Sequence, residues 1–165
     1  MKRRALVVGV VAVAAVTAAA VYLTLQPARQ IPRLLIYLDK DKCKRCGMVI
    51  SRQEFAAGLF VEGMDDWWKY DDIKCMLKDY IESSERVKVL AAAVFDYHTK
   101  EQLDAMAANY VKADPKKLWT PMSSGIVAAK DSSVAEQIAH KHDGHVYSWQ
   151  KIIEEVKKGA VTHHG

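Results

Sequence analysis

The stretch DDIKCMLKDYIESSERVKVLAAAV, residues 71–94, predicts a helix followed by a strand. Asp71 or Asp72 is suited to cap a helix, because an aspartate carboxylate accepts backbone N–H groups that the start of a helix leaves free. The helix is expected to run to about Glu82. Its apolar residues recur at helical spacing: Ile73, Met76, Leu77, Tyr80 and Ile81. The apolar run centred on 89–94 follows as a strand, so helix and strand are mixed within one segment.

Further elements are expected on both sides of this stretch. The segment 43–50 is expected to begin as a turn and to end extended. Strands are predicted at 55–61, 126–129 and 145–147, and a short apolar run at 34–38 could form an edge strand. Helices are predicted from Ser132 or Ser133 to His140, and from Ser148 to about Lys158. The segment 103–111 fits either a helix or a strand. The order strand–strand–helix–strand then occurs twice, around 46–97 and 107–147, which predicts an α+β fold of two ββαβ-like units.

The N-terminus predicts a membrane anchor or a signal segment over residues 1–25. Three cations, Lys2 to Arg4, precede an uncharged run from Ala5 to Leu25, whose 21 residues can span a bilayer as a helix. The positive flank predicts that the rest of the chain is exported. Small residues at 18–20 leave a cleaved signal peptide open. We expect an extracytoplasmic, periplasmic domain over 40–160 that follows a linker at 26–39, and that is anchored by residues 5–25 or released by cleavage.

Charge excludes one class of function. The chain has 24 basic and 20 acidic residues and a formal net charge of +4. No run rich in Lys or Arg lies in the globular part, whereas a nucleic-acid reader needs a basic patch to meet phosphates. We therefore expect no nucleic-acid partner.

Cys43-Lys-Arg-Cys-Gly-Met48 is the sharpest chemical feature of the chain. The chain has three cysteines, an odd number that cannot all be paired in an exported protein. Cys43 and Cys46 can chelate one ion from a turn, and in extended backbone Cys46 and Met48 point the same way. Thiolate and thioether are soft ligands that select copper(I). Lys44 and Arg45 are expected to lower the thiol pKa values and so favour thiolate.

Three other interpretations of this motif compete with copper binding. A thioredoxin-like redox pair has the same cysteine spacing, although it would precede a long helix and a strand-like GMVIS follows here. A structural zinc site would need four ligands, and so Cys75 or a histidine from elsewhere in the chain. A disulfide between Cys43 and Cys46 would enclose a very small loop.

Two more sulfur residues lie outside apolar stripes and are candidate ligands. Cys75 points away from the apolar stripe of its helix, so it is not expected to belong to the core. Met122 follows Thr120-Pro121 and precedes Ser-Ser-Gly, and a methionine among turn residues has no obvious packing role there. Buried methionines such as Met76 are more often core residues than ligands.

Three segments together resemble the nitrous oxide reductase accessory protein family, NosL. They are Cys-Lys-Arg-Cys-Gly-Met-Val-Ile at 43–50, Tyr-Asp-Asp-Ile-Lys-Cys-Met-Leu at 70–77, and Thr-Pro-Met-Ser-Ser-Gly-Ile-Val-Ala at 120–128. The resemblance spans about residues 40–150. It implies a periplasmic copper(I) chaperone with paired ββαβ units, a fold partly shared with organomercurial lyases. It carries copper binding to Cys46, Met48 and Met122, and less directly to Cys43 and Cys75.

These observations predict a membrane-tethered copper(I) carrier and no enzymatic activity. The expected partner is a client copper enzyme, such as nitrous oxide reductase in denitrification, or its maturation complex. Members of the family are typically lipoproteins, whereas this chain carries a peptide segment in place of the lipid. The alternative is a membrane-anchored thiol–disulfide oxidoreductase that uses Cys43 and Cys46. A carrier needs a third soft ligand such as Met48 or Met122, and an oxidoreductase does not.

Overall fold

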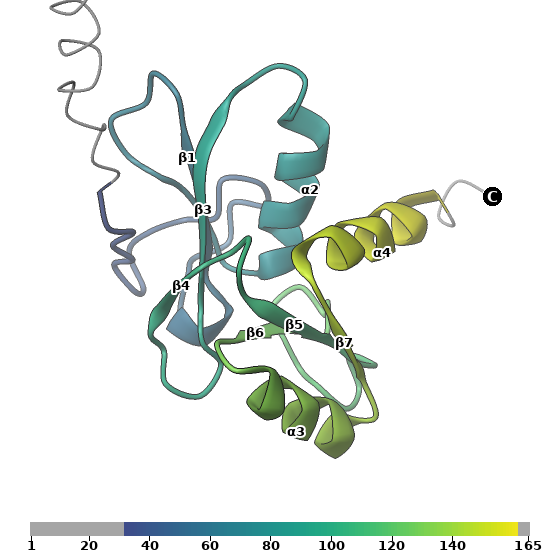
Figure 1. Ribbon diagram of the computed structural model, residues 1–165. Helices are drawn as coiled ribbons and strands as arrows, with labels where there is room; N and C mark the ends of the chain where they lie inside the picture. The colour runs from purple at the N-terminus through teal and green to yellow at the C-terminus, as the bar shows by residue number, and fades with distance from the viewer. Residues whose placement is uncertain (1–31, 162–165) are drawn as a thin grey trace, which may run out of the picture. The chain divides into compact units, whose positions relative to one another are not determined.

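The computed structural model describes residues 32–161, and for residues 160 and 161 it describes the backbone alone. Two antiparallel sheets form its framework (Figure 1). The first has the order β2-β1-β3-β4 and the second the order β6-β5-β7. The strands are β1 Ala57–Val61, β2 Trp68–Tyr70, β3 Val89–Phe95, β4 Gln102–Asp104, β5 Asn109–Lys112, β6 Ile126–Ala129 and β7 His145–Tyr147. The helices are the short 3₁₀ turn η1 Gln53–Phe55, α2 Ile73–Ser83, α3 Ser132–His142 and α4 Trp149–Val161.

The order strand–strand–helix–strand occurs twice along the chain, as β1-β2-α2-β3 and as β5-β6-α3-β7. The mixed helix and strand fold is therefore as predicted, with one change in the first unit. The segment 43–50 begins as a turn, as expected, but its end forms no strand, because only Val49 makes a single bridge, to Lys42. The missing strand is Trp68–Tyr70, which lies beside β1 and directly before α2. The segment 103–111 divides between two strands, β4 and β5, which a turn separates.

The main core lies between the sheets and the helices α2 and α4. Residues of β1 alternate between two faces. Leu59 points into this core, whereas Phe60 packs on the opposite face of the sheet. β5 alternates in the same way, since Tyr110 joins the main core and Val111 packs under α3. Both sheets are therefore covered on both faces.

The opposite face of the first sheet is covered by the chain between residues 32 and 50. Leu34 and Ile50 are buried there against Phe60. A Cβ at Gly58 would lie 2.8 Å from the Leu34 side chain and 2.9 Å from the Trp67 ring, so a larger residue there would force these side chains to shift. The expected strand at 34–38 is absent, because this segment packs through its side chains and pairs with no strand. The last residues of the expected linker thus lie against the sheet.

Asp96 and Asp72 each connect the first ββαβ unit to the second. The Tyr97 N–H donates to the Ala128 carbonyl, and Asp96 accepts the Lys130 N–H, each at 2.9 Å. Asp72 performs the same role at the start of α2, where it accepts from the loop that precedes β6. The candidate metal site lies beside this contact between Asp72 and the loop before β6.

The expected anchor over 5–25 lies outside the described residues. Within 32–161 no helix is long and apolar enough to cross a bilayer.

Candidate metal centre

The loop that carries Cys43 and Cys46 is the tip of a short hairpin. The Cys43 N–H donates to the Met48 carbonyl at 2.7 Å, and the Gly47 N–H closes the turn on the Cys43 carbonyl at 2.8 Å. Gly47 has a φ of +75°, a conformation that glycine adopts without strain. The turn directs the side chain of Cys43 inward and leaves Cys46 at the surface.

The first turn of α2 faces this hairpin tip. The Asp72 side chain caps the helix by accepting the Lys74 N–H at 2.8 Å, which confirms one of the two predicted caps. Because Asp72 fills the capping position, Asp71 is left to point elsewhere. Three residues after the cap, Cys75 lies in the first helical turn.

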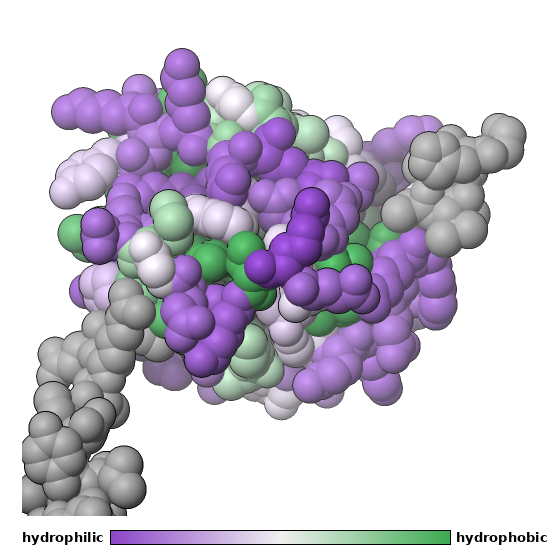
Figure 2. Space-filling view, turned by 90° about the horizontal axis from the view of Figure 1, so that it is seen from above, coloured by the Kyte–Doolittle hydropathy of each residue, from purple (hydrophilic) through white to green (hydrophobic). Residues whose placement is uncertain are grey.

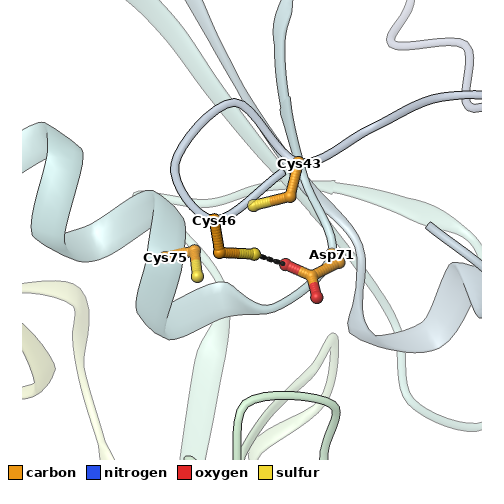
Figure 3. A group of neighbouring side chains, drawn as sticks. All are labelled: Cys43, Cys46, Asp71 and Cys75. Atoms are coloured by element: carbon orange, nitrogen blue, oxygen red, sulfur yellow. Dashed lines mark hydrogen bonds between the residues drawn. The ribbon is translucent and has the colours of Figure 1, made fainter. Parts of the chain in front are cut away.

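These two elements bring four side chains together (Figure 3). The sulfur atoms of Cys43, Cys46 and Cys75 and a carboxylate oxygen of Asp71 all lie within 4.8 Å of one another. The Cys46 thiol donates to Asp71 Oδ1 at 3.4 Å. Cys43, Asp71 and Cys75 are only 2 to 4 % exposed. The group therefore has a buried interior and one exposed member, Cys46.

Asp71 is the member of the group that sequence reasoning missed. Its second carboxylate oxygen, Oδ2, is buried without a hydrogen-bond partner in the described chain. Burial, followed by the neighbouring Cys43 thiol, raises the pKa of Asp71 to about 6. The sequence does hold one signal for Asp71, the pair Asp71-Asp72 before α2. One aspartate is enough to cap the helix, so the other is free for a different role.

The three thiols differ in acidity. The hydrogen bond from Cys75 is the main reason that the pKa of Cys43 is lowered to about 4, against the opposing effect of burial. The same contact raises the pKa of Cys75, which keeps its proton and donates it. Burial raises the pKa of Cys46 to about 11. In the metal-free protein Cys43 is therefore the thiol that most readily loses its proton, whereas Cys46 and Cys75 keep theirs.

Lys44 and Arg45 do not lower the thiol pKa values in the way expected from sequence. The Lys44 ammonium lies over the ring of Trp68, 4.2 Å from its centroid. Arg45 forms ion pairs with Asp79 and Glu82 on α2. Both cations thus hold the hairpin tip against β2 and α2, and it is the Cys75 thiol that favours the Cys43 thiolate.

Cys75 is buried, contrary to the expectation that it lies outside the core. It does sit away from the apolar stripe of α2, but the hairpin tip covers that side of the helix as well. Helical periodicity describes one face of α2 and contains no information on a loop 30 residues earlier in the chain. The burial of Cys75 is therefore a tertiary effect.

The two candidate methionines lie in different settings. Met48 is 46 % exposed on the hairpin. The argument that extended backbone aligns Cys46 with Met48 is wrong, because Cys46 lies in the turn and Gly47 has a positive φ. Met122 is half-buried against the main core, and its N–H donates to Asp72 Oδ2 at 3.1 Å.

Comparison with known proteins assigns the chain to a family. The family model for NosL matches residues 36–157. The chain belongs to the NosL family. That span includes the hairpin, α2 and the Met122 loop, so the predicted resemblance is confirmed.

A solved structure shares the fold of this NosL family member. It is the crystal structure of the copper chaperone NosL from Shewanella denitrificans, with a TM-score of 0.60 and 17 % sequence identity. The match covers 76 % of this chain and 96 % of that one. At this identity the likeness establishes the fold alone. No curated protein sequence matches the chain.

The donor set is suited to a soft metal ion. Three sulfur atoms favour copper(I), which prefers thiolates and thioethers to oxygen ligands. Three cysteines and a carboxylate also number four, the coordination number of a structural zinc site. The sequence argument against zinc assumed that Cys75 was distant, and the structure places it in the cluster. The cluster therefore meets the ligand count of a zinc site as well as the ligand preference of copper(I).

Proposed function

We propose that this chain is a periplasmic copper(I) metallochaperone that delivers copper to an enzyme such as nitrous oxide reductase. The observation that carries the proposal is the convergence of three thiols and Asp71 within 4.8 Å at a site whose Cys46 is exposed. Metal transfer requires an incoming ligand to reach the ion before it leaves. An exposed thiol at the edge of a buried cluster supplies that route.

The proposed ligand set combines buried and exposed sulfur atoms. Cys43 and Cys75 hold copper(I) from within, and Cys46 closes the site from the surface. Met48 or Met122 supplies one further thioether donor when the ion is bound. Copper is the cargo of this protein, and the chain itself catalyses no reaction.

Tethering completes the proposal. Residues 5–25 anchor the chain in the inner membrane, with the domain on the periplasmic side, and residues from 26 onward connect the two. The support is the charge-free run behind Lys2-Arg3-Arg4. Digestion of spheroplasts with an added protease tests this placement: the domain is degraded while a cytoplasmic marker survives. A protected domain contradicts it.

A second candidate is a thiol–disulfide oxidoreductase, and the lowered pKa of Cys43 favours it. The nucleophile of such an enzyme must meet a partner disulfide at the surface. Here the acidic thiol of Cys43 is 2 % exposed, whereas the exposed Cys46 has the raised pKa. The arrangement thus fits metal capture better than disulfide exchange.

Anaerobic titration with copper(I) separates the two candidates. A carrier binds one copper(I) per reduced chain, and its affinity falls when Met48 or Met122 is replaced by leucine. An oxidoreductase reduces insulin disulfides, needs Cys43 and Cys46 equally, and is unaffected by either methionine substitution. Turnover of insulin that depends on both cysteines, together with silent methionine variants, contradicts the carrier.

A further inference from the structure

Exposed apolar side chains gather on the hairpin that carries the metal cluster. Among the described residues nine large apolar side chains are exposed, and five of them fall between residues 35 and 49. They are Leu35, Tyr37, Leu38, Met48 and Val49. Figure 2 shows one face of the molecule, on which hydrophilic residues predominate and hydrophobic residues form smaller areas. Such a concentration beside a functional group is typical of an interaction surface.

Backbone hydrogen bonds make this patch part of one rigid unit with the cysteines. The Asp39 N–H donates to the Ile50 carbonyl and the Ile50 N–H to the Asp41 carbonyl, both at 2.9 Å. Val49 pairs with Lys42, one residue before Cys43. A partner that docks on this hairpin therefore comes close to the exposed Cys46.

Charge around the patch indicates the chemistry of the partner. Lys40 and Lys42 are exposed and form no ion pair among residues 32–161. The carboxylate of Asp41 is already engaged, because Lys69 binds it at 3.0 Å. Asp39, directly before Lys40, is exposed as well, so the patch carries both signs of charge, with the two lysines in excess of this one carboxylate. Exposed cations beside exposed apolar groups fit a protein surface with an apolar centre and carboxylates at its rim.

A lipid surface fits the same patch less well. Lys69 also binds Asp66 at 3.4 Å, and the Asp66 side chain is 73 % exposed. The Lys69 ammonium lies 5.5 Å from the centroid of the Tyr37 ring, so an exposed carboxylate sits close to the patch. An anionic leaflet would repel that carboxylate, whereas a protein can place charges of both signs to match.

We infer that the exposed side of hairpin 37–50 is the surface on which the copper-accepting enzyme docks, through carboxylates that meet Lys40 and Lys42 around an apolar contact with Val49. The inference rests on the proposed function, because it names the surface used for delivery. The inference can be tested apart from the proposed function. Substitutions in the patch are expected to slow copper transfer to a protein and to leave copper affinity unchanged.

Transfer kinetics test this surface directly. The full chain, in detergent and loaded with copper(I), is mixed with copper-free nitrous oxide reductase or with the small chelator bathocuproine disulfonate. The variants are Lys40→Glu/Lys42→Glu and Val49→Asp. The matched controls are Lys151→Glu/Lys157→Glu on α4 and Val146→Asp on β7, which change exposed residues of the same types.

Both hairpin variants should transfer copper to the enzyme at least about tenfold more slowly, a loss of about 1.4 kcal/mol in docking. Transfer to the chelator and copper affinity should stay within about threefold of the unmodified chain, and both controls should behave like it. Rising salt should slow transfer to the enzyme by the unmodified chain and have less effect on the lysine variant.

Four results overturn the inference, and they are distinguishable from one another. Unchanged transfer by the hairpin variants removes the docking surface and leaves copper binding intact. Release to the chelator alone, with none to the enzyme, removes the named acceptor. Hydrogen exchange on the full chain tests two other occupants of this surface. Protection of residues 37–50 by phosphatidylglycerol nanodiscs assigns the surface to lipid. Protection of the same residues that grows with protein concentration assigns it to a second copy of the chain. A chain that binds no copper(I) overturns the proposed function itself.

Discussion

The backbone N–H of Met122 donates to Oδ2 of Asp72 at 3.1 Å, across 50 residues of sequence. The same carboxylate accepts the Ser124 hydroxyl at 3.1 Å, and its other oxygen caps α2 through Lys74. One buried side chain therefore fixes the Met122 loop against the helix that carries Cys75. This joint positions a thioether-bearing loop from the second half of the fold beside a helix from the first.

Removal of the Asp72 carboxylate should destabilise the fold. Asp72→Ala leaves the start of α2 uncapped and removes the acceptor of the Met122 N–H and the Ser124 hydroxyl, so we expect a loss of about 2–4 kcal/mol in the free energy of unfolding. Urea denaturation followed by circular dichroism measures it. Asp131→Ala is the matched control, because Asp131 occupies the cap position of α3 without a side-chain hydrogen bond. Equal losses in the two variants would contradict the assigned role of Asp72.

The methionine variants test the ligand set. Leucine resembles methionine in volume, so Met48→Leu and Met122→Leu should keep the fold while each removes a thioether. We expect at least one of them to lower copper(I) affinity by about tenfold, and both to change the melting temperature of the metal-free protein little. Met64→Leu is the control for Met48, since Met64 is similarly exposed at 42 %. Copper affinities that match this control in both variants would remove the methionines from the site.

The conformation of Gly47 gives a prediction with a built-in comparison. Gly47 and Gly63 have φ angles of +75° and +83°, and a Cβ at either position meets no atom within 4 Å. Alanine at either position should therefore strain the backbone and lower the free energy of unfolding by a similar amount, about 1 kcal/mol. Only Gly47→Ala should also weaken copper(I) binding, because only Gly47 lies in the turn that orients Cys43 and Cys46. If both variants keep full affinity, the turn geometry does not set the site.

The fold predicts how stability depends on pH through Asp96. Burial acts to raise the pKa of Asp96, but hydrogen bonds from the Thr99, Lys130 and His98 backbone N–H groups outweigh it, and the pKa is lowered. A lowered folded-state pKa adds stability above the unfolded value of about 3.9, and that stability is lost as pH falls through the folded value. Asp96→Asn should thus cost about 1–2 kcal/mol at pH 7 and less at pH 3.

Unfolding at both pH values checks this prediction. Asp104→Asn is the control, because Asp104 makes a similar backbone hydrogen bond, to Met106, in an exposed turn. A difference between Asp96→Asn and the unmodified chain that stays constant down to pH 3 would contradict a role for the ionised carboxylate.

The sequence predicted most elements because their signals are local. The cap at Asp72, the apolar stripe of α2 and the run at 89–94 lie within single segments, and the structure contains each of them. The strand Trp68–Tyr70 was missed because three residues beside four aspartates resemble a solvated turn. Its pairing with β1 provides the stabilisation that the segment alone does not show.

The site was predictable only in part, for a different reason. The spacing of Cys43 and Cys46 is visible in the sequence, but the positions of Asp71 and Cys75 depend on how a distant hairpin packs over α2. The low pKa of Cys43 likewise arises from Cys75 and not from the neighbouring cations. Contacts between residues 25 to 32 positions apart in the chain leave no periodic pattern in a single sequence.

The central claim is that the cysteine cluster holds copper(I) in preference to zinc, and competition titration tests it most directly. The reduced full chain is titrated anaerobically with copper(I) against a chromophoric chelator, with and without equimolar zinc, beside Cys46→Ser. We predict one tightly bound copper(I) per chain, retained in the presence of zinc and lost in Cys46→Ser. Displacement of copper by equimolar zinc, or tight binding that persists in Cys46→Ser, would contradict the account.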